Sequence, residues 1–78
     1  MLGSDTHNDV SPLTHPGIGN AVHVVGLVAM GLWLIDNMNL EDVARAAAER
    51  KRWEFLLTIP PLRLQNVTGS PVNPIAMF

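Results

Sequence analysis

His23 and Asp36 are the two side chains in this sequence best suited to do chemistry. Residues 21–35 are apolar except for His23, and Asp36 follows them directly. An imidazole and a carboxylate held together can ligate zinc or manganese, or can relay a proton from metal-activated water. Two groups are too few for tight binding, because catalytic metal sites usually have three protein ligands. Two plainer interpretations stay open: His23 is a hydrogen-bonded core residue, and Asp36 is an acidic turn residue before Asn37.

The segment between these residues predicts a helix that turns back into a strand. We expect the helix over about Ala21–Met30, ended by Gly31 in a left-handed conformation. From His23 to its end this helix rises roughly 11 Å. A buried strand over Leu32–Asp36 covers roughly 13–16 Å in return. If Gly31 reverses the chain, Asp36 comes back level with His23 and the two side chains can share one site.

Capping residues and β-branched runs predict the remaining elements. Asn20 is a candidate N-cap of the first helix, and Asn39, with Asp42 three residues on, caps a second. The second helix is expected over about Leu40–Arg50, with a stripe of Leu40, Val43, Ala44 and Ala47. Extended segments are expected at Met1–Val10, Trp53–Ile59 and Val72–Phe78. The predicted order is β, α, β, α, β, β, an α/β chain with two helices and short strands in mixed order.

Other polar and aromatic residues receive plainer interpretations. We expect His7 and His15 to be solvated loop residues, and residues 11–19, which contain several glycines and prolines, to form a flexible loop. Trp33, Trp53 and Phe55 are interpreted as core or interface anchors.

Composition bounds the function classes. The chain has 78 residues, 47% of them hydrophobic, which is more than a small domain can bury, so another chain or a further part of this one is expected to cover the excess. A net charge of −2 gives no basic footprint for nucleic acid. The apolar run is too short and too glycine-rich for a membrane span. No cysteine is present, so a cytoplasmic setting is the default expectation.

Several blocks of the sequence resemble one family. The run from His23 to Phe78 is similar to the C-terminal part of the cyclase family of metal-dependent hydrolases, which includes kynurenine formamidases and isatin hydrolases. Its most specific pieces are His23 to Asp36-Asn37 and the terminal block 69–76, GSPVNPIA. The opening LGSDTHNDVSP is similar to the family strand that precedes this part.

The resemblance implies a swivelling β/β/α-type fold and the hydrolysis of a small formyl amide or cyclic amide through water activated by zinc or manganese. It implies a site role for His23 and Asp36, as metal ligands or as groups supporting a ligand. Family members carry most ligands in an upstream motif H-x-G-T-H-x-D-x-P, for which we expect no counterpart here. We therefore expect residues 1–78 to be a single incomplete domain that is inactive alone, and homo-oligomeric as family members commonly are. The alternative is a non-catalytic fragment or interaction module.

Overall fold

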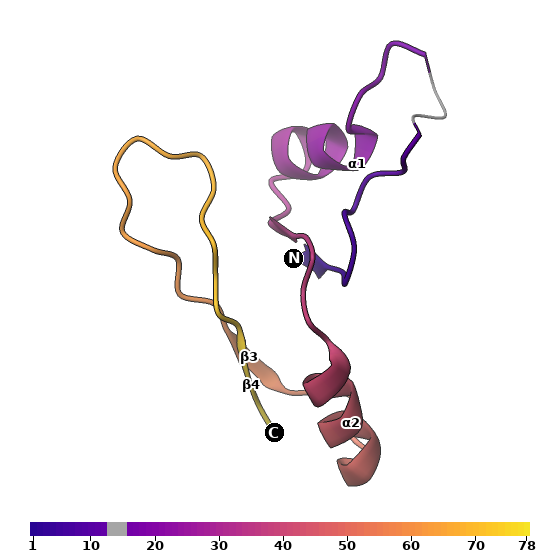
Figure 1. Cartoon of the computed structure of the whole chain (residues 1–78), viewed down its shortest axis with the longest axis vertical. Helices are drawn as coiled ribbons and strands as arrows, with labels where there is room; N and C mark the ends of the chain where they lie inside the picture. The colour runs from indigo at the N-terminus through magenta and orange to yellow at the C-terminus, as the bar shows by residue number, and fades with distance from the viewer. Residues whose placement is uncertain (13–15) are drawn as a thin grey trace. The chain divides into compact units, whose positions relative to one another are not determined.

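The computed structural model describes residues 1–12 and 16–78, and it divides the chain into two compact units (Figure 1). Unit 1 is Met1–Leu40 and unit 2 is Glu41–Phe78. The elements are β1 (Leu2–Gly3), α1 (Ala21–His23), the π-helix η1 (Val24–Ala29), β2 (Leu34–Ile35), α2 (Glu41–Arg50), β3 (Leu56–Thr58) and β4 (Ile75–Met77). This order confirms the predicted one, and the mixture of helices with two small sheets confirms a mixed α/β chain. The single-domain expectation stays a prediction.

The sheet of unit 1 brings the segment after β1 beside the end of β2. The two strands pair in parallel, with Leu2 opposite Leu34 and Gly3 opposite Ile35. The pairing continues beyond the strands, where the Asn37 N–H donates to the Thr6 carbonyl over 3.0 Å. Strand β2 is shorter than the predicted Leu32–Asp36, because the N–H of Leu32 donates back to a helix carbonyl at 2.7 Å rather than to the sheet.

The first helix has the predicted extent but changes type along its length. After α1, the chain widens into η1, where the Met30 N–H donates to the carbonyl of Val25, five residues back, over 3.0 Å. Gly26 is the buried residue of η1, and a Cβ there would lie 3.5 Å from the Leu34 methyl carbons. The glycine therefore lets the helix lie close against β2. Gly31 has a φ of +62° and ends the helix, as predicted.

Asn20 does not cap this helix with its side chain, so that prediction was wrong. Its φ and ψ are both 51°, and its side chain makes no capping hydrogen bond. An N-cap side chain reaches the helix N–H groups from an extended backbone, which this left-handed conformation does not provide. The carboxylate of Asp9 replaces it, accepting from the Val22 N–H at 2.5 Å and from the His23 N–H at 3.4 Å.

Unit 2 contains α2 and an antiparallel hairpin. Helix α2 confirms the predicted second helix; Ala47 on its expected apolar stripe is buried, whereas Ala44 is exposed. Strands β3 and β4 pair with Leu57 opposite Ala76, within the two predicted extended segments (Figure 1). The rings of Phe55 and Phe78, which flank the paired strands, lie 5.2 Å apart between centroids.

The two tryptophans lie outside any core of the described residues. Trp33 and Trp53 are each 70% exposed, so the core reading was wrong for both and the interface reading stays a prediction. The described residues of the predicted loop, 11–12 and 16–19, lie in neither helix nor strand, while residues 13–15, including His15, fall outside the described part. Among the described helices, none combines the length and the apolar character needed to cross a membrane.

We predict that Gly31→Ala lowers the free energy of unfolding by about 1 kcal/mol, because a Cβ is unfavourable at positive φ. Chemical denaturation measures this difference. The matched control is Gly19→Ala, where the backbone φ lies outside the left-handed range and the space around the glycine is open. Equal destabilisation by both substitutions would contradict the proposed role of Gly31 in reversing the chain.

Candidate functional site

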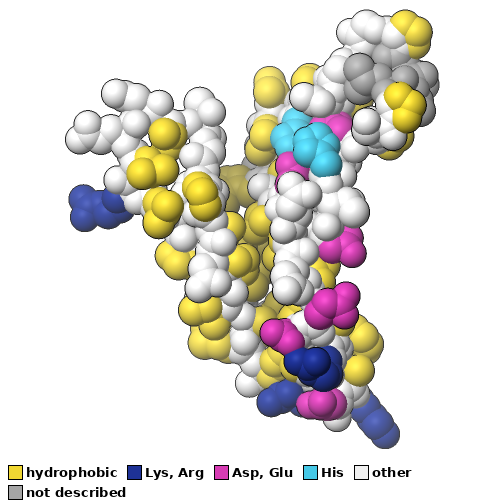
Figure 2. All heavy atoms as spheres, in the orientation of Figure 1, with side chains coloured by type: hydrophobic (Ala, Val, Ile, Leu, Met, Phe, Trp, Pro, Cys, Tyr) yellow, Lys and Arg dark blue, Asp and Glu magenta, His cyan; other side chains and the backbone are white. Residues whose placement is uncertain are grey.

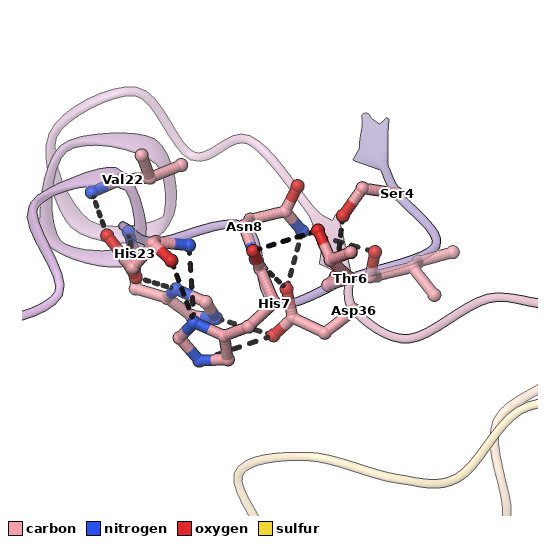
Figure 3. Close-up of polar contacts among 9 residues, drawn as sticks. Ser4, Thr6, His7, Asn8, Val22, His23 and Asp36 are labelled. Carbon is pink, nitrogen blue, oxygen red and sulfur yellow. Dashed lines mark hydrogen bonds and ion pairs between the residues drawn. The ribbon is translucent and has the colours of Figure 1, made fainter. Parts of the chain in front are cut away.

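His23 and Asp36 lie together in unit 1 (Figure 3). Nε2 of His23 is 3.0 Å from Oδ2 of Asp36, and the two side chains are 25% and 22% exposed. The helix from α1 into η1 carries the imidazole, and the end of β2 carries the carboxylate. The spacing argument, in which Gly31 returns Asp36 to the level of His23, is confirmed.

Asp9 holds the other side of the His23 ring and was missed by the sequence analysis. Its Oδ2 pairs with Nδ1 of His23 in a short contact, while Oδ1 accepts the Val22 N–H. The side chain of Asp9 is only 4% exposed. A buried carboxylate needs such partners, because an unpaired charge away from water is unfavourable. Asp9 therefore fixes the position of the helix start and the orientation of the imidazole together.

His7 also belongs to this cluster, although its side chain is 52% exposed. Its ring stacks on that of His23, with centroids 5.0 Å apart, and its Nε2 lies 3.9 Å from Oδ2 of Asp36. Nδ1 of His7 can accept the Asp9 N–H at 3.2 Å or donate to the Asp9 carbonyl at 3.5 Å. The second arrangement leaves a lone pair on Nε2. The loop location predicted for His7 is confirmed, but its contact with the site was not foreseen.

Asn8 fixes the carboxylate of Asp36. Both its backbone N–H and its side-chain amide donate to Oδ1, at 2.8 and 2.6 Å. The same amide donates to the carbonyl of Ile35 at 3.1 Å, which ties Asn8 to the end of β2. Figure 3 shows His7 and His23 on one side of Asp36 and Asn8 on the other.

The electrostatics favour the charged forms of the three groups, so that the carboxylates of Asp9 and Asp36 face the imidazolium of His23. The hydrogen bond with Asp9, helped by the charge of Asp36, raises the pKa of His23 above its ordinary value of 6.5. The backbone N–H of Asn8 is the largest influence on Asp36, and its pKa lies below the ordinary 3.8. Desolvation is the largest influence on Asp9 and raises its pKa, but the hydrogen bonds from His23 and Val22 together outweigh it, so the pKa is lowered.

His7, His23 and Asp36 offer three ligand atoms for one metal ion. These atoms all lie within 4.8 Å of one another. Imidazole nitrogen and carboxylate oxygen suit zinc and manganese, and three protein ligands with an open fourth position are typical of catalytic zinc. The histidines are accessible on the face shown in Figure 2, with acidic side chains adjoining them. The donor set therefore fits the divalent metal that the resemblance implies.

The sequence contained a sign of the missed residues. Thr6-His7-Asn8-Asp9 has the T-H-x-D letters of the upstream motif for which no counterpart was expected, but Gly3 and Asp5 stand where that motif has histidine and glycine. The proline follows at position 12, one residue later than the motif places it. His7 was instead interpreted as a solvated loop residue, because the whole motif has no counterpart here. His15 lies outside the described residues.

Comparisons with protein-family models, with curated proteins and with solved structures found no match for this chain.

We predict that the metal-free chain loses stability as the pH rises from about 6 to about 9. The raised pKa of His23 contributes stability that is fully present below 6.5 and is lost as the pH passes through its folded value. Urea denaturation at the two pH values measures this loss. Asp9→Asn removes the partner charge and should shrink the difference, whereas Asp5→Asn, at an exposed position, should preserve it. An Asp9→Asn variant with the full pH dependence would contradict the pairing.

Proposed function

We propose that unit 1 binds one divalent metal ion through Nε2 of His7, Nε2 of His23 and Oδ2 of Asp36. The convergence of one ligand atom from each of these three residues carries the proposal. Ligand atoms about 2.0–2.1 Å from a tetrahedral zinc lie about 3.3 Å from each other. The separations of 3.0 and 3.9 Å between Asp36 Oδ2 and the two imidazoles bracket that value. Small side-chain movements would therefore bring the donors to ligand distances.

The contact between Asp9 and His23 supports this proposal. Histidine ligands usually donate their second ring N–H to a carboxylate or carbonyl, which fixes the tautomer and raises the basicity of the ligating nitrogen. Asp9 occupies that position at Nδ1 of His23. The Nε2 proton of His23 must leave for the metal to bind, so metal affinity should rise with pH through the raised pKa of His23.

For the reaction class, we infer metal-dependent hydrolysis of an amide C–N bond, of the cyclase-family type. The resemblance of the blocks after His23 and the T-H-x-D letters of residues 6–9 support this inference. The substrate class would be a small formyl amide or cyclic amide, and a swivelling β/β/α-type fold and homo-oligomers would follow from the same resemblance. A cytoplasmic setting would follow from the lack of cysteine. A divalent cation at such a site supplies Lewis acidity toward a carbonyl and toward water.

The chain's own residues would hold and orient this centre. His23, held by Asp9, presents Nε2, and Asp36, held by Asn8, presents Oδ2 beside it. We propose metal binding as a property of these 78 residues, and amide hydrolysis as a property of the family fold as a whole.

We predict that the chain binds one Zn²⁺ per molecule and that His7→Ala, His23→Ala and Asp36→Asn each weaken binding by at least about tenfold. Isothermal titration calorimetry measures the stoichiometry and affinity. Asp42→Asn is the matched control, because Asp42 is an exposed acid on α2 in unit 2. Unchanged affinity in the three site variants would contradict the metal site. The chain joined to its upstream coding region tests the reaction class separately. If it binds zinc but cleaves no N-formyl or lactam substrate, the inferred hydrolase activity is contradicted and the metal site is not.

A second candidate function is that of a non-catalytic interaction module. The observation in its favour is the exposure of large apolar side chains, including Val24, Val28 and Trp33 in unit 1 and Trp53 and Leu56 in unit 2. Exposed apolar side chains that gather into a patch commonly mark contacts with other chains. On this account, analytical ultracentrifugation should find the chain self-associated. A well-behaved monomer over a wide concentration range would count against the module.

A further inference from the structure

We propose that Asn8 is a positioning residue that makes Asp36 a one-oxygen metal ligand. The inference rests on the proposed metal site and adds a constraint on its coordination number. A carboxylate can bind a metal through one oxygen or through both, and the choice changes the number of ligand atoms around the ion. In unit 1 the two oxygens of Asp36 have different partners, and Asn8 is the residue that makes the two oxygens different.

The geometry assigns Oδ1 to Asn8. This oxygen accepts two hydrogen bonds from the same residue, at 2.8 Å from the backbone N–H and at 2.6 Å from the side-chain amide. Oδ2 instead faces the two imidazoles, at 3.0 Å from His23 and 3.9 Å from His7. A metal ion placed between these imidazoles would thus meet Oδ2, while Oδ1 stays bonded on the far side.

Asn8 is itself held in place, so it can resist rotation of the carboxylate. Its amide makes a second hydrogen bond to the carbonyl of Ile35, the residue just before Asp36. For Asp36 to bind through both oxygens, Oδ1 would have to leave two donors. Each of these donors would then need a new partner in a part-buried position, which is unfavourable. The Asn8 amide therefore favours a site with three protein ligand atoms and a low coordination number over a site with four protein ligand atoms.

The test uses the whole chain loaded with Co²⁺, whose visible absorption is strong in four-coordinate sites and weak in six-coordinate ones. Asn8→Leu removes the amide donor at similar side-chain size, while the backbone N–H remains. We expect it to weaken Co²⁺ binding by about tenfold, because Asp36 is held less firmly toward the ion. The visible absorption per bound ion should also fall, because one of the two donors that keep Oδ1 from the metal is lost. Asn73→Leu, an exposed position in unit 2, is the control and should change neither quantity.

Each outcome decides the proposal. Wild-type absorption and affinity in Asn8→Leu would overturn the role of Asn8 while leaving the metal site intact. No Co²⁺ binding by the wild-type chain would overturn both the site and this role. If circular dichroism shows that Asn8→Leu is unfolded, zinc X-ray absorption of the wild-type chain decides instead. A first shell of four nitrogen and oxygen atoms with one carboxylate oxygen supports the proposal, and two oxygens from Asp36 overturn it.

Discussion

The buried carboxylate of Asp9 is the constraint on which the rest of unit 1 depends. Because its charge is almost entirely removed from water, it must be paired, and its partners come from a distant part of the chain. Oδ1 accepts the Val22 N–H, and Oδ2 pairs with the imidazole of His23. The same contacts satisfy the start of the helix, where a negative charge is favoured by the helix dipole. One side chain thus joins the formation of the helix to the orientation of His23.

The parallel pairing of β1 with β2 brings the other half of the site into place. It aligns the segment after β1 with the end of β2, so that Asn8 contacts Asp36 directly. Two glycines make this geometry possible. Gly26 allows η1 to lie against Leu34, and Gly31 reverses the chain between the helix and β2. His23 and Asp36 consequently meet through backbone constraints as well as through their own attraction.

Local patterns predicted much of this structure, and long-range contacts account for most of what was missed. The helix stop at Gly31 and the return of Asp36 follow from residue spacing, which the sequence displays directly. The loss of Asn20 as a cap was not predictable in the same way, because Asp9, far away in sequence, supplies the acceptor instead. The contact of His7 with the site was not foreseen for the same reason: its relation to His23 depends on the pairing of β1 with β2. The exposed tryptophans show that apolar character alone does not place a side chain in a core.

The central claim is that His7, His23 and Asp36 form one metal centre with Asp9 behind His23. Two-dimensional NMR of histidine ring nitrogens during titration with Zn²⁺ tests it most directly. We expect the Nε2 resonances of His7 and His23 to shift together toward metal-bound values, while Nδ1 of His23 keeps its proton and donates it in a hydrogen bond to Asp9. Unchanged His7 and His23 resonances at saturating Zn²⁺, or a change confined to His15, would contradict the account.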